Sequence, residues 1–234
     1  MRSRRPVSRY APSGRLSANV GRRSRGQFMD ISSEQLAYWY LRLNGFLTIP
    51  NFVVHPDCGR NQETDVDVLG IRLPYRAENL HRPMKDEPRF TRVHEKSFIA
   101  IAEVKSGRCA LNGPWTSPER QNMLRVFRAV GAFPKIEADL AAQSLYETGH
   151  YQSQLYYVSL MCLGREVNPD VAARYPLVPQ VLWPDVLAFI YRRFSEYKNQ
   201  KASHPQWDAH GTALWEVFER SRDERQFEEN IRVL

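Results

Sequence analysis

Residues 98–107 read FIAIAEVKSG, and this stretch decides the fold class. The run Phe98–Val104 is almost continuously apolar, which predicts a strand that protein covers on both faces. Side chains two residues apart in a strand point to the same side. Glu103 and Lys105 therefore share a face with Ile101, and the sequence places a carboxylate beside an amine at the end of a buried strand.

A second acidic strand precedes this one in the chain. Residues 64–70 read TDVDVLG, a pattern typical of a strand with Asp65 and Asp67 on one face. Acids at the margin of buried strands are costly unless they are hydrated, paired or bound to a metal. If the two strands are neighbours, Asp67, Glu103 and the backbone carbonyl of Val104 form a pocket of oxygen atoms. Such a pocket suits Mg²⁺, which prefers oxygen ligands.

The spacing of apolar and turn residues predicts the other elements and an α/β fold class. Ser32 and Gln35 have the spacing of a capping box, so we expect a helix that ends at Asn44-Gly45. Segment 74–96 holds three prolines among many charges and is expected to be an inserted loop. The expected order is αβββααβαα. Its remaining members are strands at Phe46–Val54, Val66–Leu73 and Gln154–Leu163, and helices from Ser117, over Lys135–Tyr146, from Pro184 and from Ala213.

Composition bounds the class of protein. The 234 residues are 42% hydrophobic and 25% charged, which is ordinary for a globular protein and excludes collagenous, disulfide-scaffold and largely disordered classes. No internal repeat or second core is visible, so one domain is expected over residues 29–234. The three cysteines lack a CxxC spacing and fit a reducing, cytoplasmic compartment. No apolar run approaches the roughly eighteen residues of a membrane span, so no membrane association is expected.

The positive charge of the chain is concentrated in one segment. The formal net charge is +7, but residues 1–29 hold eight arginines and no acid, which leaves −1 for residues 30–234. Residues 1–28 have no apolar periodicity and are expected to be a disordered basic tail. The tail can be explained as a nucleic-acid-tracking arm, as an organelle transit peptide, or as a translated upstream stretch with Met29 as the working start.

The two acidic strands and the helix before them resemble the PD-(D/E)xK nuclease superfamily. The resemblance is carried by Glu34 in the first helix, by the stretch 64–70, and by the stretch AEVKSG at 102–107, in an αβββαβ order. It covers about residues 30–165. The restriction-endonuclease-like fold that it implies has a central mixed sheet flanked by helices, and residues of about 183–225 would then be a C-terminal helical elaboration.

The resemblance implies metal-dependent hydrolysis of a phosphodiester. Asp67 and Glu103, with the Val104 carbonyl, would hold Mg²⁺, with Mn²⁺ as a substitute. Lys105 would orient the attacking water or offset charge in the transition state. Glu34 would join this catalytic group from the first helix. The 36 positions from Asp67 to Glu103 are long for the family unless segment 74–96 is an insertion.

Two further residues are weaker candidates, and each residue of the site has a structural alternative. Asp65 competes with Asp67 for one role, and Gln154 could reach the site from the fourth strand, as a Gln or Lys does in some relatives. The alternatives are a solvated Glu103–Lys105 edge pair, aspartates that only end a strand, and a Gln154 that is only a polar strand end. Glu34 also fits a first-turn acid that serves the helix dipole.

The expected function is that of a DNA endonuclease, with nucleic acid as the partner. The alternative is a nuclease fold without catalysis that serves nucleic-acid binding or assembly. Composition does not choose between DNA and RNA, between endonuclease and exonuclease, or among target sequences. A homodimer is expected only by analogy with relatives that pair to cut two strands.

Overall fold

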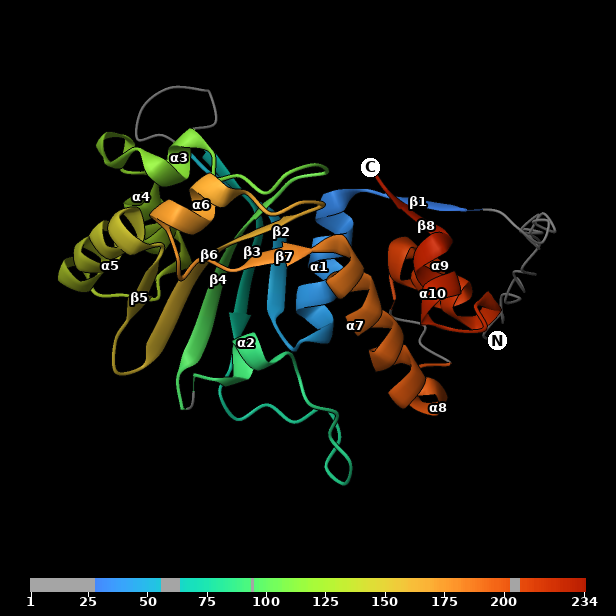
Figure 1. Cartoon of the computed structure of the whole chain (residues 1–234). Coiled ribbons are helices and arrows are strands. Elements are labelled where there is room, and N and C mark those ends of the chain that lie inside the picture. Colours follow the sequence, from blue (N-terminus) through green and yellow to red (C-terminus); the bar gives the residue numbers. More distant parts are fainter. Residues whose placement is uncertain (1–27, 56–63, 94, 203–206) are drawn as a thin grey trace, which may run out of the picture.

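The computed structural model describes residues 28–55, 64–93, 95–202 and 207–234 (Figure 1). Apart from Phe28, the tail expected at 1–28 lies outside the described residues, as does the polar turn expected at 57–62. The described chain is α/β, with a mixed central sheet flanked by helices. No helix within the described ranges is long and apolar enough to cross a membrane.

The central sheet confirms the expected strands and adds two short ones. Strands β2, β3 and β4 are antiparallel neighbours, and β4 lies parallel to β6. The short strands β5 and β7 both pair with β6, antiparallel and parallel respectively. The strands are β2 (Leu47–Val54), β3 (Thr64–Arg72), β4 (Ser97–Val104), β5 (His150–Gln152), β6 (Tyr156–Gly164) and β7 (Gln180–Leu182).

One face of the sheet is covered by helix α1 (Ser33–Leu43) and by α7, and the helices α9 and α10 pack on the side of α7 that is away from the sheet (Figure 1). The expected cap of α1 is present, because the Ser32 hydroxyl accepts a hydrogen bond from the Gln35 backbone N–H at 3.3 Å. Apolar side chains of α7, α9 and α10 share one buried cluster with α1 and β4. The C-terminal helices are α7 (Trp183–Glu196), α8 (Lys198–Lys201), α9 (Ala209–Arg220) and α10 (Glu224–Glu229).

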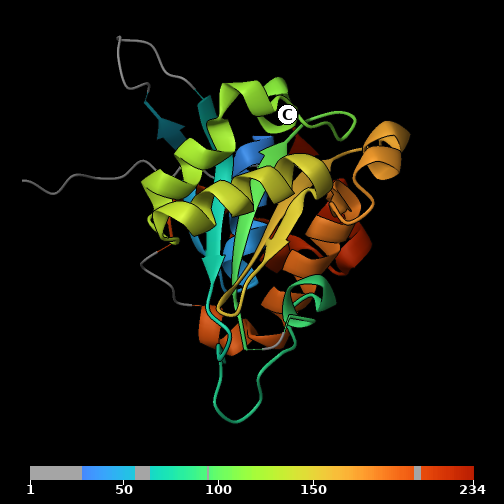
Figure 2. The same cartoon turned by 90° about the vertical axis from the view of Figure 1, so that its left-hand side faces the viewer.

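The opposite face is covered by helices from the middle of the chain, and Figure 2 shows α4 and α5 lying across it. Side chains of β4 alternate between the two faces, so Ala100 and Ala102 face α1 whereas Ile99 and Ile101 face this second layer. The helices of this layer are α3 (Gly113–Thr116), α4 (Asn122–Val130), α5 (Lys135–Thr148) and α6 (Pro169–Arg174).

The boundaries expected near residues 117 and 154 are wrong. The helix expected from Ser117 is broken by Gln121, which has a φ of +55°, so a 3-10 turn (Pro118–Arg120) precedes α4. The strand expected from Gln154 begins at Tyr156, because residues 153–155 form the turn of the β5–β6 hairpin. Sequence patterns do not mark this turn, since it contains neither glycine nor proline.

The segment 74–96 is an excursion between two adjacent strands, as expected, but it is fastened to the core. It contains the short helix α2 (Pro88–Thr91). The backbone N–H of Glu87 donates to Asn44 Oδ1 at 2.9 Å, at the end of α1.

Two short strands pair outside the central sheet: β8 (Ile231–Val233) lies parallel to β1 (Met29–Ile31). Both elements went unnoticed in the sequence because each is only three residues long.

Candidate functional site

The two acidic strands are neighbours, as the sequence predicts, and their register brings Asp67 and Glu103 together. The antiparallel pairing ends at Val68 and Ala102, and the next residues in register are Asp67 and Glu103. Beyond the last paired residues, the Asp67 side chain replaces a main-chain acceptor, since its Oδ2 accepts a hydrogen bond from the Val104 N–H at 2.7 Å. The two carboxylates therefore lie on one face of the sheet, where β3 begins and β4 ends.

Glu103 is buried and both of its oxygens are engaged. Only 2% of the surface of Glu103 is exposed to solvent. Oε1 lies 2.5 Å from Lys105 Nζ, and Oε2 accepts a hydrogen bond from Trp115 Nε1 at 2.5 Å. The main chain holds Lys105 in place, because its N–H donates to the Leu163 carbonyl of β6 at 2.9 Å. A buried carboxylate with two such donors is compensated, so Glu103 is not an unpaired charge.

Asp67 has a perturbed ionisation equilibrium. The pKa of Asp67 is raised from 3.8 to about 6, mainly by burial and also by the neighbouring charges of Glu103 and Asp65. The Val104 N–H and the Lys105 ammonium oppose this rise. Clusters of carboxylates with raised pKa values are common at sites that bind cations or transfer protons.

The donor atoms at this site suit a hard divalent cation only in part. Asp67 and Glu103 offer carboxylate oxygens, which Mg²⁺ prefers. No group of three or more His, Cys, Asp or Glu side chains that could hold a metal occurs in the part of the chain that the structure describes. A cation here would therefore complete its shell with water and main-chain carbonyl oxygen. At Glu103 it would compete with the hydrogen bonds from Lys105 and Trp115.

The structure does not bring every expected residue to this pair. Glu34 is half-buried in the first turn of α1, on the face opposite to the Glu103 side chain, and within the described ranges no hydrogen bond or ion pair joins it to Asp67 or Glu103. Gln154 is exposed in the hairpin turn beside Ser97, at the other end of β4. Asp65 is half-buried and acts on Asp67 through its charge.

Trp115 is a residue of the site that the sequence analysis missed. It lies in α3, whose start is marked in the sequence by Asn112 as N-cap and by Pro114 in the first turn. These signals could have placed a short helix that begins nine positions after the acidic strand ends. They could not have shown that the indole N–H reaches Glu103, since that contact depends on how α3 folds back over the sheet.

Two cysteines are buried in this layer, and one of them, Cys162, lies beside Glu103. Cys162 occupies the position on β6 that is paired with Glu103, and the charge of Cys109 adds to the rise in its pKa that burial causes. Burial also raises the pKa of Cys109 to about 11. Both sulfur atoms therefore stay protonated near neutral pH, and neither is a ready metal ligand or nucleophile.

Comparison of the chain with protein-family models, with curated proteins and with solved structures finds no match. Any functional interpretation therefore depends on the geometry of the site and on the arrangement of the strands that form it.

Proposed function

We propose that this chain is a metal-dependent nuclease of the PD-(D/E)xK type that hydrolyses phosphodiester bonds in DNA. The observation that carries the proposal is the meeting of Asp67 and Glu103 on adjacent strands, with the Lys105 ammonium 2.5 Å from Glu103 Oε1. A carboxylate pair beside a lysine is suited to phosphoryl chemistry, because the carboxylates can hold a cation and the lysine can stabilise developing negative charge.

Each of the three side chains has a distinct role in this proposal. Asp67 and Glu103 would hold Mg²⁺, which when bound would polarise the phosphate and lower the pKa of a bound water. Ionisation of Asp67 favours binding, and the positive charge of a cation would in turn favour ionised Asp67. Once released from Glu103, the Lys105 ammonium would orient the attacking water or offset charge on the phosphate.

The arrangement of the strands supports a restriction-endonuclease-like fold. The helix α1 precedes three antiparallel strands, and β6 follows as a parallel neighbour of β4 after the helices α3, α4 and α5 and the short strand β5. The long separation of Asp67 and Glu103 is accounted for by the excursion over residues 74–96, because the two strands that flank the excursion are still adjacent. An αβββαβ core with one insertion is consistent with these features.

A second candidate function is a nuclease fold that binds nucleic acid without catalysis. The observation that favours it is the burial of Glu103, whose two oxygens accept hydrogen bonds from Lys105 and Trp115 and are nearly inaccessible to solvent. A carboxylate that is already compensated by a lysine and an indole gains less from a cation. This candidate predicts that millimolar Mg²⁺ or Mn²⁺ does not bind.

The test is cleavage of plasmid and linear DNA by the full chain with Mg²⁺, with Mn²⁺ or with EDTA, and with RNA as a parallel substrate. Asp67→Asn and Lys105→Met should abolish metal-dependent cleavage. The matched controls are Asp139→Asn, at an exposed acid, and Lys135→Met, at an exposed lysine, both on α5 and outside the site. If the wild-type protein cuts no better than Asp67→Asn, the proposed catalysis is wrong.

A further inference from the structure

A cluster of buried charges joins the segment 74–96 to the core at the far end of β3. The Asp86 carboxylate accepts hydrogen bonds from three arginines: from Arg72 Nη2 at 2.7 Å, from Arg76 Nη1 at 2.7 Å and from Arg193 Nη2 at 2.6 Å. Arg193 comes from α7 and its side chain is fully buried. The absence of a side chain at Gly45 leaves room for Arg76, because a Cβ there would lie 1.8 Å from Arg76 Nε.

The second carboxylate of the cluster is Glu78. It pairs with Arg76 at 3.0 Å, with Arg193 at 2.8 Å and with Lys201 at 2.7 Å. Burial alone would raise the pKa of Glu78, but the hydrogen bond and charge of Lys201, with the charges of Arg193 and Arg76, hold it below its usual range. Glu78 is therefore ionised at neutral pH, like a carboxylate in any strong ion pair.

The charges of this cluster do not balance. Four cationic side chains surround two carboxylates, and none of the six side chains is more than 22% exposed. Desolvated charges are costly unless an opposite charge compensates them. The excess of two positive charges is thus a source of instability that an external dianion would relieve.

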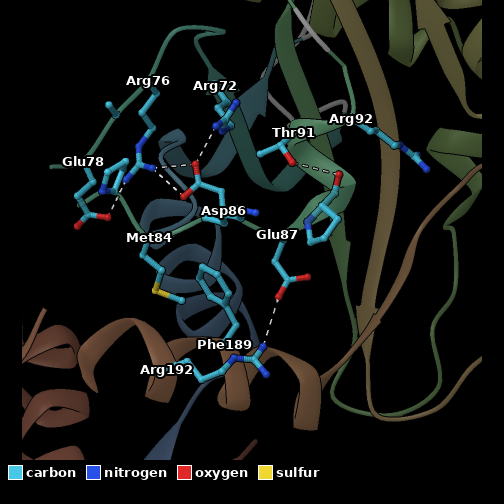
Figure 3. Close-up of a pocket in the computed structure, with 14 residues that line it drawn as sticks. Arg72, Arg76, Glu78, Met84, Asp86, Glu87, Thr91, Arg92, Phe189 and Arg192 are labelled. Carbon is cyan, nitrogen blue, oxygen red and sulfur yellow. Dashed lines mark hydrogen bonds and ion pairs between the residues drawn. The ribbon is translucent and has the colours of Figure 1, made fainter. Parts of the chain in front are cut away.

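A cleft of about 750 Å³ opens onto this cluster. Figure 3 shows Arg72, Arg76 and Asp86 on one side of it and Met84 and Phe189 beside them. The cleft is also lined by three exposed cations, Lys85, Arg92 and Arg192. Besides Asp86 and Glu78 of the cluster, its lining includes one more acid, Glu87, which lies 3.8 Å from Arg192. A volume of this size with apolar surface and a few charged groups is typical of small-ligand sites.

Two segments that border the cleft carry a net positive charge. Residues 72–96 hold seven Lys and Arg against four Asp and Glu, and residues 185–201 hold four against two. These two segments together carry +5, although residues 30–234 as a whole carry −1. The cleft therefore lies between two segments of net positive charge, which attract anions. The carboxylate pair lies near the opposite end of β3.

We propose that this cleft binds a phosphate-bearing small molecule of about nucleotide size. The phosphate lies against Arg72 and Arg76, with Lys85 and Arg192 closing over it, and its two negative charges balance the excess of the cluster. Met84 and Phe189 offer an apolar surface to the rest of the ligand. The site is separate from the Asp67–Glu103 pair and does not depend on the proposed nuclease function.

The test is thermal unfolding and titration calorimetry of the full chain in EDTA, which removes any contribution from a metal at the carboxylate pair. The probes are inorganic phosphate and adenosine monophosphate, with potassium chloride at the same ionic strength as the reference. The cleft variant is Lys85→Ala with Arg192→Ala. The matched control is Lys135→Ala with Arg120→Ala, two exposed cations distant from the cleft.

The expected result is a saturable rise in melting temperature, of about 3–5 °C at ten times the dissociation constant. The cleft variant should weaken binding at least about tenfold, as expected for the loss of two charge-assisted contacts, and the control should not. Tighter binding of adenosine monophosphate supports the proposal, and equal binding of the two probes overturns the nucleotide-sized ligand, because Met84 and Phe189 would then add nothing. The proposal is overturned if neither probe saturates, if both variants behave alike, or if a DNA oligonucleotide binds and neither small probe does.

Discussion

The raised pKa of Asp67 makes stability depend on pH in a way that one substitution should remove. Asp67→Asn keeps the shape of the side chain, and its amide oxygen can still accept the Val104 N–H that Asp67 Oδ2 accepts at 2.7 Å. What it deletes is the negative charge beside Glu103. We therefore expect the variant to be more stable than the wild type wherever Asp67 is ionised.

The magnitude follows from linkage. The pKa is about 6 in the folded chain against 3.8 for the free side chain. The folded state therefore holds the proton more tightly, so the favourable contribution is present below pH 3.8 and is lost as pH rises through 6. About two units of pKa correspond to at most about 3 kcal/mol, and the partial exposure of Asp67 reduces the expected value to about 1 kcal/mol.

The assay is urea unfolding from pH 4 to pH 8, followed by tryptophan fluorescence in EDTA. Asp67→Asn should be about 1 kcal/mol more stable than the wild type at pH 8, with a melting temperature about 2–4 °C higher, and the difference should vanish near pH 4. Asp139→Asn, at an exposed acid of α5, is the control and should show no such trend. An equal effect at pH 4 and pH 8, or no gain at pH 8, refutes the reasoning.

Four other substitutions test the two charged clusters and the cap of α1. Trp115→Phe removes a donor from buried Glu103 and should cost about 1–3 kcal/mol in urea unfolding while tightening Mg²⁺ binding in calorimetry, because one carboxylate oxygen becomes available. Asp86→Asn leaves the cations without their main partner and should cost about 3–5 kcal/mol. Arg193→Met removes one of the two excess positive charges, so its loss of unfolding free energy should be less than about half of that caused by Asp86→Asn in the same assay. Equal losses for the two variants would contradict the charge imbalance. Ser32→Ala should cost about 1 kcal/mol through loss of the α1 cap, measured in the same way, and no loss would show that the cap adds nothing.

Much of the fold could be read from local signals. The capping box at Ser32, the apolar run of β4 and the glycine that ends α5 at Gly149 each depend on residues that are near one another in the chain. Such signals report dihedral preferences and the alternation of side chains. They predict where elements begin and end except where a turn has no marker residue, as at Gln154.

The sequence by itself determined that an acid and a lysine would share a face at the end of a buried strand, because strand geometry alone requires it. The tertiary structure decided which partners they meet. The β3–β4 register selected Asp67, the fold of α3 over the sheet selected Trp115, and the packing of α1 on the other face kept Glu34 away. These contacts join residues that lie far apart in the chain, and the free energy that selects them comes from the packing of whole layers, which no short stretch of sequence specifies.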